Sequence, residues 1–151
     1  MEWMLMPLRR YAEFSGRSRR KEYWMYILFL VIVGVIIAVV EQVLGLTDLV
    51  AGNGPITTVF SLATLIPSIA VGVRRLHDTD RSGWWMLLPG PGYIAMIAAA
   101  VSMNLSMMMM AGALAAICGL VLLVFFLLEG TKGPNRFGDD PKGVNHSEVF
   151  A

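Results

Sequence analysis

Long runs of uncharged residues are the feature that most constrains how this chain folds. Eighteen uncharged residues separate Glu22 from Glu41, and a second run of 18 fills residues 56–73. A third run covers 45 residues, from Trp84 to Leu128, which is too long for one membrane crossing and about right for two. A helix rises about 1.5 Å per residue and the apolar core of a bilayer is ~30 Å thick, so each crossing is long enough. The sequence therefore predicts an all-α integral membrane protein with four transmembrane helices.

Composition agrees with membrane insertion. Only 15% of the 151 residues are charged, whereas a soluble domain usually has about 25%. The single cysteine, Cys118, cannot form an intrachain disulfide and lies inside an apolar run, where it is expected to pack as a small residue. No cleavable signal peptide is evident, so the first apolar run is interpreted as an uncleaved anchor.

We place the four spans at about 23–44, 56–73, 84–103 and 107–128. The Pro-Gly-Pro-Gly sequence at 89–92 should kink or break the third helix, because proline removes a backbone donor and glycine favours turns. Alternatively, residues 84–88 lie in the membrane interface and the third span begins near Tyr93. A polar loop is expected between Arg74 and Gly83.

Two polar segments flank the spans. Residues 1–22 are basic and amphipathic, with aromatic and leucine side chains between the arginines, and are expected to lie in the headgroup plane. Residues 129–151 are rich in glycine and proline and form a polar tail, interpreted as a structured loop up to Pro141 and a mobile terminus after it.

The positions of the basic residues predict the orientation. Six lie in residues 1–22, three lie at Arg74, Arg75 and Arg81, and three lie in the tail, which accounts for all 12. The loops at 45–55 and near Met103 hold none. Because cytoplasmic loops are enriched in lysine and arginine, both termini are predicted to be cytoplasmic. The expected location is therefore a bacterial inner membrane, crossed several times.

Three motifs resemble a known family. The segments FSGRSRRKEYW (residues 14–24), IPSIAVGVRRLHDTDRSGWW (66–85) and GTKGPNRFGDDP (130–141) are similar, in this order, to the YhaH-like small bacterial inner-membrane proteins. These proteins form a large domain-of-unknown-function family. The resemblance covers nearly the whole chain and implies a four-helix inner-membrane protein with no established enzymatic activity.

All three motifs fall on the predicted cytoplasmic side, where they could form one polar site. Arginine binds phosphate through a bidentate fork, so an anionic ligand such as a lipid headgroup or phosphate would suit such a site, and a partner protein is the other candidate. A purely structural role, locking loops to helix ends, stays open. The candidate ligand-binding residues are Arg17, Arg20, Arg74, Arg75, His77, Asp78, Arg81, Asn135, Arg136, Asp139 and Asp140.

A channel or small-solute transporter is the alternative function. Thr57, Ser61, Thr64 and Ser68 recur at helical spacing on one face of the second span, which indicates either a pore lining or a packing face. No catalytic motif is present, and no metal-ligand spacing is recognisable, so neither an enzyme nor a cofactor is expected. We expect contacts with membrane lipids, no nucleic acid, and a four-helix bundle that assembles as a homo-oligomer or with a partner.

Overall fold

The computed structural model describes residues 2–47 and 54–143, so the mobile terminus expected after Pro141 lies mostly outside the described residues. Four helices in the described residues are long and apolar enough to cross a membrane, as predicted. The third of them, Gly83–Val101, combines two elements. In chain order the elements are α1 (Glu2–Arg9), α2 (Arg20–Leu44), α3 (Pro55–Asp78), the 3₁₀ helix η1 (Gly83–Leu87), α4 (Gly90–Val101) and α5 (Leu105–Leu127).

Helix α3 extends further than the sequence indicated. It continues through Arg74 and Arg75 to Asp78, so most of the expected central loop is the last part of a helix, and the connection to η1 is short. The two arginine side chains are fully buried and bonded to protein groups. Because these charges have protein partners, they do not require a solvated loop, and the helix runs past the end of the apolar run.

The third span changes geometry near Pro89. Ser82 caps η1 by accepting a hydrogen bond from the backbone N–H of Trp84, and α4 begins again at Gly90. Gly92 then lies against α5, where an added Cβ would come 2.8 Å from the backbone nitrogen of Ala115. The α4–α5 contact therefore depends on a small residue at this position.

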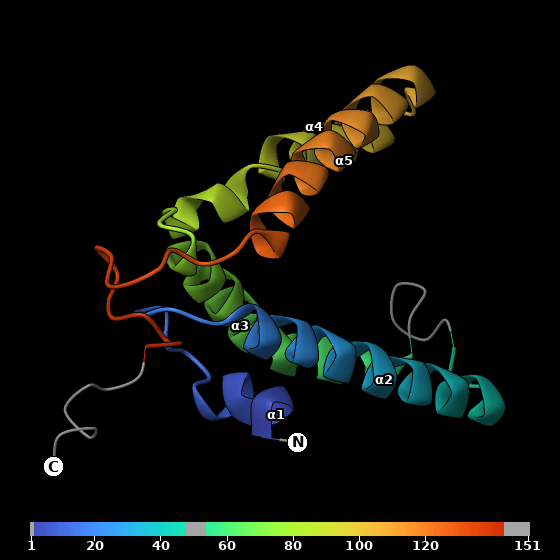
Figure 1. Cartoon of the computed structure of the whole chain (residues 1–151). Helices are drawn as coiled ribbons and strands as arrows, with labels where there is room; N and C mark the ends of the chain where they lie inside the picture. Colours follow the sequence, from blue (N-terminus) through green and yellow to red (C-terminus); the bar gives the residue numbers. More distant parts are fainter. Residues whose placement is uncertain (1, 48–53, 144–151) are drawn as a thin grey trace, which may run out of the picture.

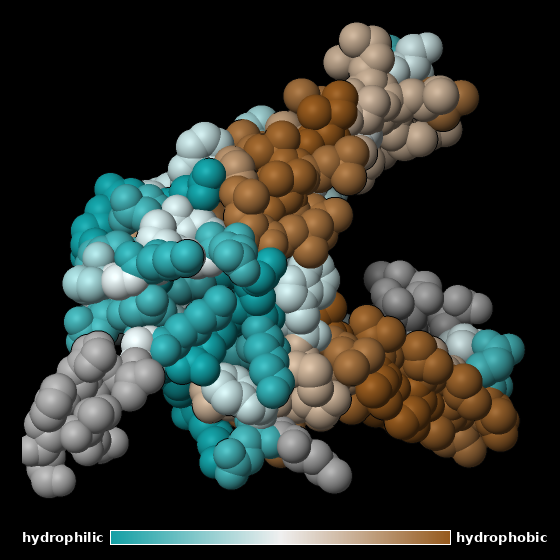
Figure 2. Space-filling view, viewed as in Figure 1, coloured by the Kyte–Doolittle hydropathy of each residue, from teal (hydrophilic) through white to brown (hydrophobic). Residues whose placement is uncertain are grey.

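The four spans form two hairpins that meet at one end (Figure 1). Helix α2 lies beside α3, α4 lies beside α5, and the hairpins diverge from the polar end of the molecule. Leu76, Leu122 and Phe126 form a buried apolar core at that end. Figure 2 shows the polar residues gathered there and apolar residues covering the diverging arms. Within one chain, then, the expected four-helix bundle is a pair of hairpins that share a core at this end.

Glu41 closes the opposite end of the α2–α3 hairpin. Its carboxylate is buried and accepts hydrogen bonds from the backbone N–H groups of Ile56 (2.6 Å) and Thr57 (3.0 Å) and from the Thr57 hydroxyl (2.6 Å). The first N–H groups of a helix have no partner within it, and Gly54 at the N-cap has no side chain to supply one. A carboxylate from α2 therefore caps α3.

Candidate functional site

Three segments distant in sequence converge at the polar end and form what we call the polar cap: residues 13–22, 74–82 and 127–143. The backbone N–H of Ser18 donates to the carbonyl of Arg74 at 3.0 Å. The backbone N–H of Thr131 donates to the carbonyl of Asp78 at 2.8 Å. The end of α3 is thus hydrogen-bonded on one side to the N-terminal segment and on the other to the tail.

Asp78 is the central acid of the polar cap. Its Oδ1 accepts from Nε of Arg17 at 3.1 Å, and its Oδ2 accepts from Nη1 of Arg75. All three side chains are almost completely buried. Gly130 lies directly over the carboxylate, since a Cβ there would come 2.1 Å from Oδ2. Two guanidinium groups share one acid, and the tail covers it.

Arg17 also binds the tail directly. Its Nη1 donates to the carbonyl of Gly133 at 2.7 Å, and its Nη2 donates to the carbonyl of Thr131. Arg74 binds the segment before α2 and the first turn of α2. Its Nη1 donates to the carbonyl of Glu13 at 3.0 Å, and its Nη2 donates to the carboxylate of Glu22 at 3.3 Å. Both guanidinium groups therefore bind protein groups rather than facing outward.

Cations cap the end of α5. Nε of Arg75 donates to the carbonyl of Phe126 at 3.2 Å, and its Nη2 donates to the carbonyl of Leu128. Nη1 of Arg20 donates to the carbonyl of Leu127 at 3.1 Å. The last carbonyls of a helix lack intrahelical partners and carry its negative dipole end, so two arginines satisfy them and favour this geometry.

His77 lies at the edge of the polar cap. Its ring stacks on Phe137 with centroids 3.8 Å apart, and Nδ1 lies 3.2 Å from the carbonyl oxygen of Gly16. Because a carbonyl only accepts, Nδ1 is the protonated nitrogen. The amide of Asn135 donates to the carbonyl of His77 at 2.8 Å, and the backbones of Asn135 and Gly138 pair across a tight turn.

The remaining candidates lie at the rim. Arg136 pairs with Asp80 at 3.2 Å, and both side chains are about half exposed or more. The guanidinium of Arg81 lies 4.2 Å from the ring centroid of Phe125. Asp139 is exposed. Arg17, Arg74, Arg75, His77, Asp78 and Asn135 are thus interlocked, whereas the rim residues do not join them.

Asp140 orders a turn in the tail segment of the polar cap. It accepts from the backbone N–H of Lys142 at 2.8 Å and of Gly133 at 3.0 Å. The N–H of Lys142, followed by that of Gly133, lowers the pKa of Asp140 below its usual value, because both donors favour the ionised carboxylate. This residue therefore fixes a loop rather than facing an open site.

The hydroxyl stripe of α3 lies mostly against its neighbours. Thr57 donates to Glu41, the buried Thr64 donates to the carbonyl of Phe60 at 2.8 Å, and Ser68 donates to the carbonyl of Thr64 at 2.6 Å. Ser68 also lies 3.4 Å from the hydroxyl of Tyr26 on α2. Ser61 alone of the four is exposed. These contacts favour the helix-packing interpretation of the stripe over a pore.

A basic groove lies between the start of α2 and the end of α5. It has a volume of about 410 Å³ and is lined by Arg20, Lys21, Trp24, Met25 and Leu127. Only Arg20 was a candidate from the sequence. The others could not be identified there, because the groove exists only once the end of α5 lies beside the start of α2.

Within residues 2–47 and 54–143, no three His, Cys, Asp or Glu side chains are grouped so as to hold a metal ion. The chemistry of the polar cap is therefore that of arginine, carboxylate and backbone carbonyl groups.

The comparisons with known proteins cover most of the chain. The model of the family described as "Protein of unknown function (DUF805)" matches residues 11–139. The chain is 44% identical over 142 residues to inner membrane protein YhaI of Escherichia coli K12, covering 94% of this chain and 97% of the relative. It is 38% identical over 142 residues to inner membrane protein YhaH of the same organism, covering 94% and 98%. No solved structure matches the chain.

Proposed function

The chain belongs to the DUF805 family, its relatives are inner membrane proteins, and we propose that it binds anionic phospholipids there without catalysis. We also propose that the polar cap and both termini lie in the cytoplasm. All 12 basic residues lie in residues 1–22, in residues 74–81 or in the tail, and none lies in the two loops at the other ends of the hairpins. Lysine and arginine accumulate on the cytoplasmic side of membrane proteins. In this orientation η1 lies in the interface and the third span bends near Pro89 before crossing.

The observation that carries the proposal is the basic rim of the groove at Arg20 and Lys21. The guanidinium groups of Arg17, Arg74 and Arg75 are buried and bonded inside the protein, so they do not meet an external anion. Arg20 is 40% exposed and Lys21 is exposed. Cations between transmembrane helices on the cytoplasmic side are suited to phospholipid headgroups.

The partner of Arg20 supports exchange with a lipid phosphate. Its Nη2 lies 2.6 Å from Oε1 of Glu129, but the Glu129 side chain is 68% exposed. Exposed ion pairs stabilise a protein by only about 0–1 kcal/mol, so a phosphate can replace Glu129 at little cost. Arg20 would keep its bond to the carbonyl of Leu127 while its other nitrogen binds the headgroup.

The rest of the groove suits the apolar part of a phospholipid. Trp24, Met25 and Leu127 line it together with the two cations, and tryptophan favours the membrane interface. Helix α1 flanks the cations, since Nζ of Lys21 and the guanidinium carbon of Arg19 lie 5.5 and 5.6 Å from the ring centroid of Trp3. The cationic side chains of the groove thus match the phosphate of a phospholipid, and the apolar side chains match its acyl chain.

The test compares two double variants that each remove two positive charges. Arg20→Gln with Lys21→Gln changes the groove, whereas Lys132→Gln with Lys142→Gln changes exposed tail residues. Native mass spectrometry of the purified protein, titrated with phosphatidylglycerol and phosphatidylcholine, measures the bound lipid. Each cation near an anionic surface contributes about 1 kcal/mol. Removing two should therefore lower the affinity for phosphatidylglycerol roughly thirtyfold.

The tail variant should bind phosphatidylglycerol nearly as the unchanged protein does. Equal losses of phosphatidylglycerol affinity in both variants would show that general surface charge causes the binding, which would contradict a site in the groove. Unchanged binding in the groove variant would also contradict it and would favour a partner protein as the ligand of the polar cap.

A further inference from the structure

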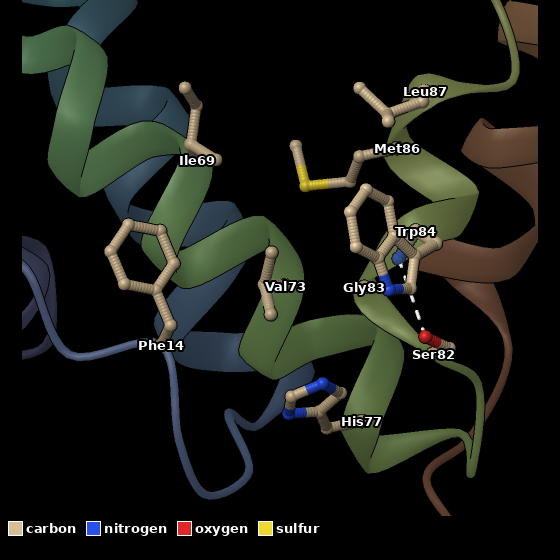
Figure 3. A pocket seen from close by; sticks show the side chains of 9 residues that line it. All are labelled: Phe14, Ile69, Val73, His77, Ser82, Gly83, Trp84, Met86 and Leu87. Carbon is tan, nitrogen blue, oxygen red and sulfur yellow. Dashed lines mark hydrogen bonds between the residues drawn. The ribbon is translucent and has the colours of Figure 1, made fainter.

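A second groove, of about 480 Å³, lies between α3 and η1 (Figure 3). Ile69 and Val73 of α3 form one wall, and side chains of η1 form the other. Phe14, from the segment before α2, lies next to the α3 wall. The groove is separate from the basic groove and shares no residue with it. Its lining residues are Phe14, Ile69, Val73, His77, Ser82, Gly83, Trp84, Met86 and Leu87.

The polar groups of this groove lie at one end. His77 and Ser82 are drawn there together, while Ile69 and Leu87 lie at the other end. Ile69 precedes His77 by two turns of α3, which corresponds to about 12 Å along the helix axis. The groove is therefore elongated, with an apolar length and a polar end, as an amphiphile with one chain requires.

His77 and Ser82 offer complementary hydrogen-bonding atoms. Nδ1 of His77 donates to the carbonyl of Gly16, so Nε2 of the neutral ring accepts, and it has no partner among the described residues. Oγ of Ser82 accepts from the N–H of Trp84 at 3.5 Å, which leaves its hydroxyl proton free to donate. One acceptor and one donor at the same end of the groove match a protonated carboxyl group, and protonation of His77 converts them into two donors for a carboxylate.

The apolar walls face the bilayer. Ile69, Leu87 and Trp84 are 39%, 61% and 79% exposed, so the groove opens sideways along a surface that lipid covers. Met86, an unbranched and flexible side chain, reaches over Gly72, where a Cβ would come 2.9 Å from its methyl carbon. A chain can therefore enter from the membrane and the wall can adapt to it.

We infer that this groove binds one long-chain fatty acid, with its carboxyl group between His77 and Ser82 and its chain along Ile69, Val73 and Leu87. A diacyl phospholipid fits less well, because it brings two chains and a phosphodiester that has no proton to donate to a neutral Nε2. The site does not involve Arg20 or Lys21, so it stands independently of the phospholipid groove.

The experiment is photocrosslinking of the purified protein in phosphatidylcholine nanodiscs with a palmitic acid that carries a diazirine on its chain. We expect adducts, mapped by tandem mass spectrometry, on the peptides that contain Val73 and Met86. Unlabelled palmitic acid should suppress them, whereas methyl palmitate, which has the chain but no acidic proton, should not. Suppression by both compounds alike, or the absence of adducts on the peptides that contain Val73 and Met86, would overturn the assignment.

Two variants at matched positions on α3 test the place of binding. Val73→Phe fills the groove, and overpacking of this kind should reduce labelling on the order of tenfold. Val59→Phe, at a position 67% exposed on the same helix, should leave labelling unchanged. Equal labelling of the two variants would contradict the proposal.

A third variant keeps the test valid if Val73→Phe folds poorly. Ser82→Ala removes one hydrogen bond and no apolar wall, so the affinity for palmitic acid should fall roughly fivefold while weak binding of methyl palmitate stays the same. If this variant kept the normal preference for palmitic acid over methyl palmitate, Ser82 would not take part in binding the carboxyl group.

Discussion

The guanidinium of Arg17 lies 3.0 Å from the carboxylate of Asp78, although 61 residues separate them in the chain, and both side chains are nearly excluded from solvent. Through this pair the segment before α2 is fixed to the end of α3. Arg17 also binds the carbonyls of Thr131 and Gly133, so the tail is fixed to the same point. The polar cap thus joins the two hairpins and both terminal segments.

Replacing Asp78 by alanine should strongly destabilise the protein. The change leaves Arg17 and Arg75 buried without their shared acid, and loss of one partner from a buried ion pair costs about 3–5 kcal/mol. Thermal unfolding in detergent should show a large decrease in Tm, and limited proteolysis should cleave the tail after Lys132 more rapidly. Asp139→Ala, at an exposed neighbouring acid, is the control and should behave like the unchanged protein. Similar stability of both variants would refute the central place of Asp78.

Gly92→Ala should weaken the α4–α5 contact. The added methyl would lie 2.8 Å from the backbone of Ala115, closer than packed atoms approach, so the helices would have to separate. Overpacking of this kind costs about 1–3 kcal/mol, measurable as a lower midpoint in unfolding by sodium dodecyl sulfate. Gly119→Ala is the matched change, since nothing lies within 4 Å of that position, and it should be neutral or slightly stabilising. If Gly119→Ala destabilised the protein as much, the packing register described for α4 and α5 would be wrong.

Glu41→Ala should destabilise the end of the α2–α3 hairpin opposite the polar cap. Without the carboxylate, the N–H groups of Ile56 and Thr57 lose the acceptor that caps α3. We expect a Tm lower by several degrees and faster hydrogen exchange at these two amides. Gln42→Ala changes the next side chain, which is exposed, and should leave both quantities as they are. Unaltered exchange at Ile56 in Glu41→Ala would argue against the cap.

The spans were predictable from the sequence, but their ends were not. Uncharged runs define the four apolar helices, since only an uncharged helix of that length suits the bilayer core. The end of α3 was placed at Val73 because Arg74 follows, and a charge normally marks the membrane boundary. That inference fails where the groups that bind the charge come from distant segments, as Glu22 does for Arg74 and the carbonyl of Phe126 does for Arg75.

The sequence indicated that three polar motifs lie at one end of the molecule, but not how their residues are arranged there. Residue types in three motifs identified arginine, histidine and aspartate at one end of the molecule. They could not indicate that Arg17 and Arg75 share Asp78, which requires the geometry of the folded chain. Nor could they indicate Lys21 and Trp24, which become part of a groove only because α5 ends beside them.

Acid should loosen the turn that Asp140 orders in the tail segment of the polar cap. Backbone donors lower the pKa of this carboxyl in the folded state, so its stabilising effect is complete above the ordinary aspartate pKa and is lost as the pH falls through the lowered one. Protection factors for the amides of Gly133 and Lys142 should therefore be constant near neutral pH and decrease below about pH 4. In Asp140→Ala protection should be low at every pH. A decrease with the same midpoint in that variant would assign the titration to another group.

The orientation of the polar cap can be measured directly by cysteine labelling in a Cys118→Ser background. Met103→Cys lies between α4 and α5, where the native side chain is 90% exposed, and Lys142→Cys lies in the exposed tail at the other end. In sealed right-side-out vesicles, a membrane-impermeant maleimide should label the position of Met103 at once and that of Lys142 only after detergent is added. Labelling of Lys142→Cys in sealed vesicles, with Met103→Cys protected, would place the polar cap outside the cytoplasm and contradict the account.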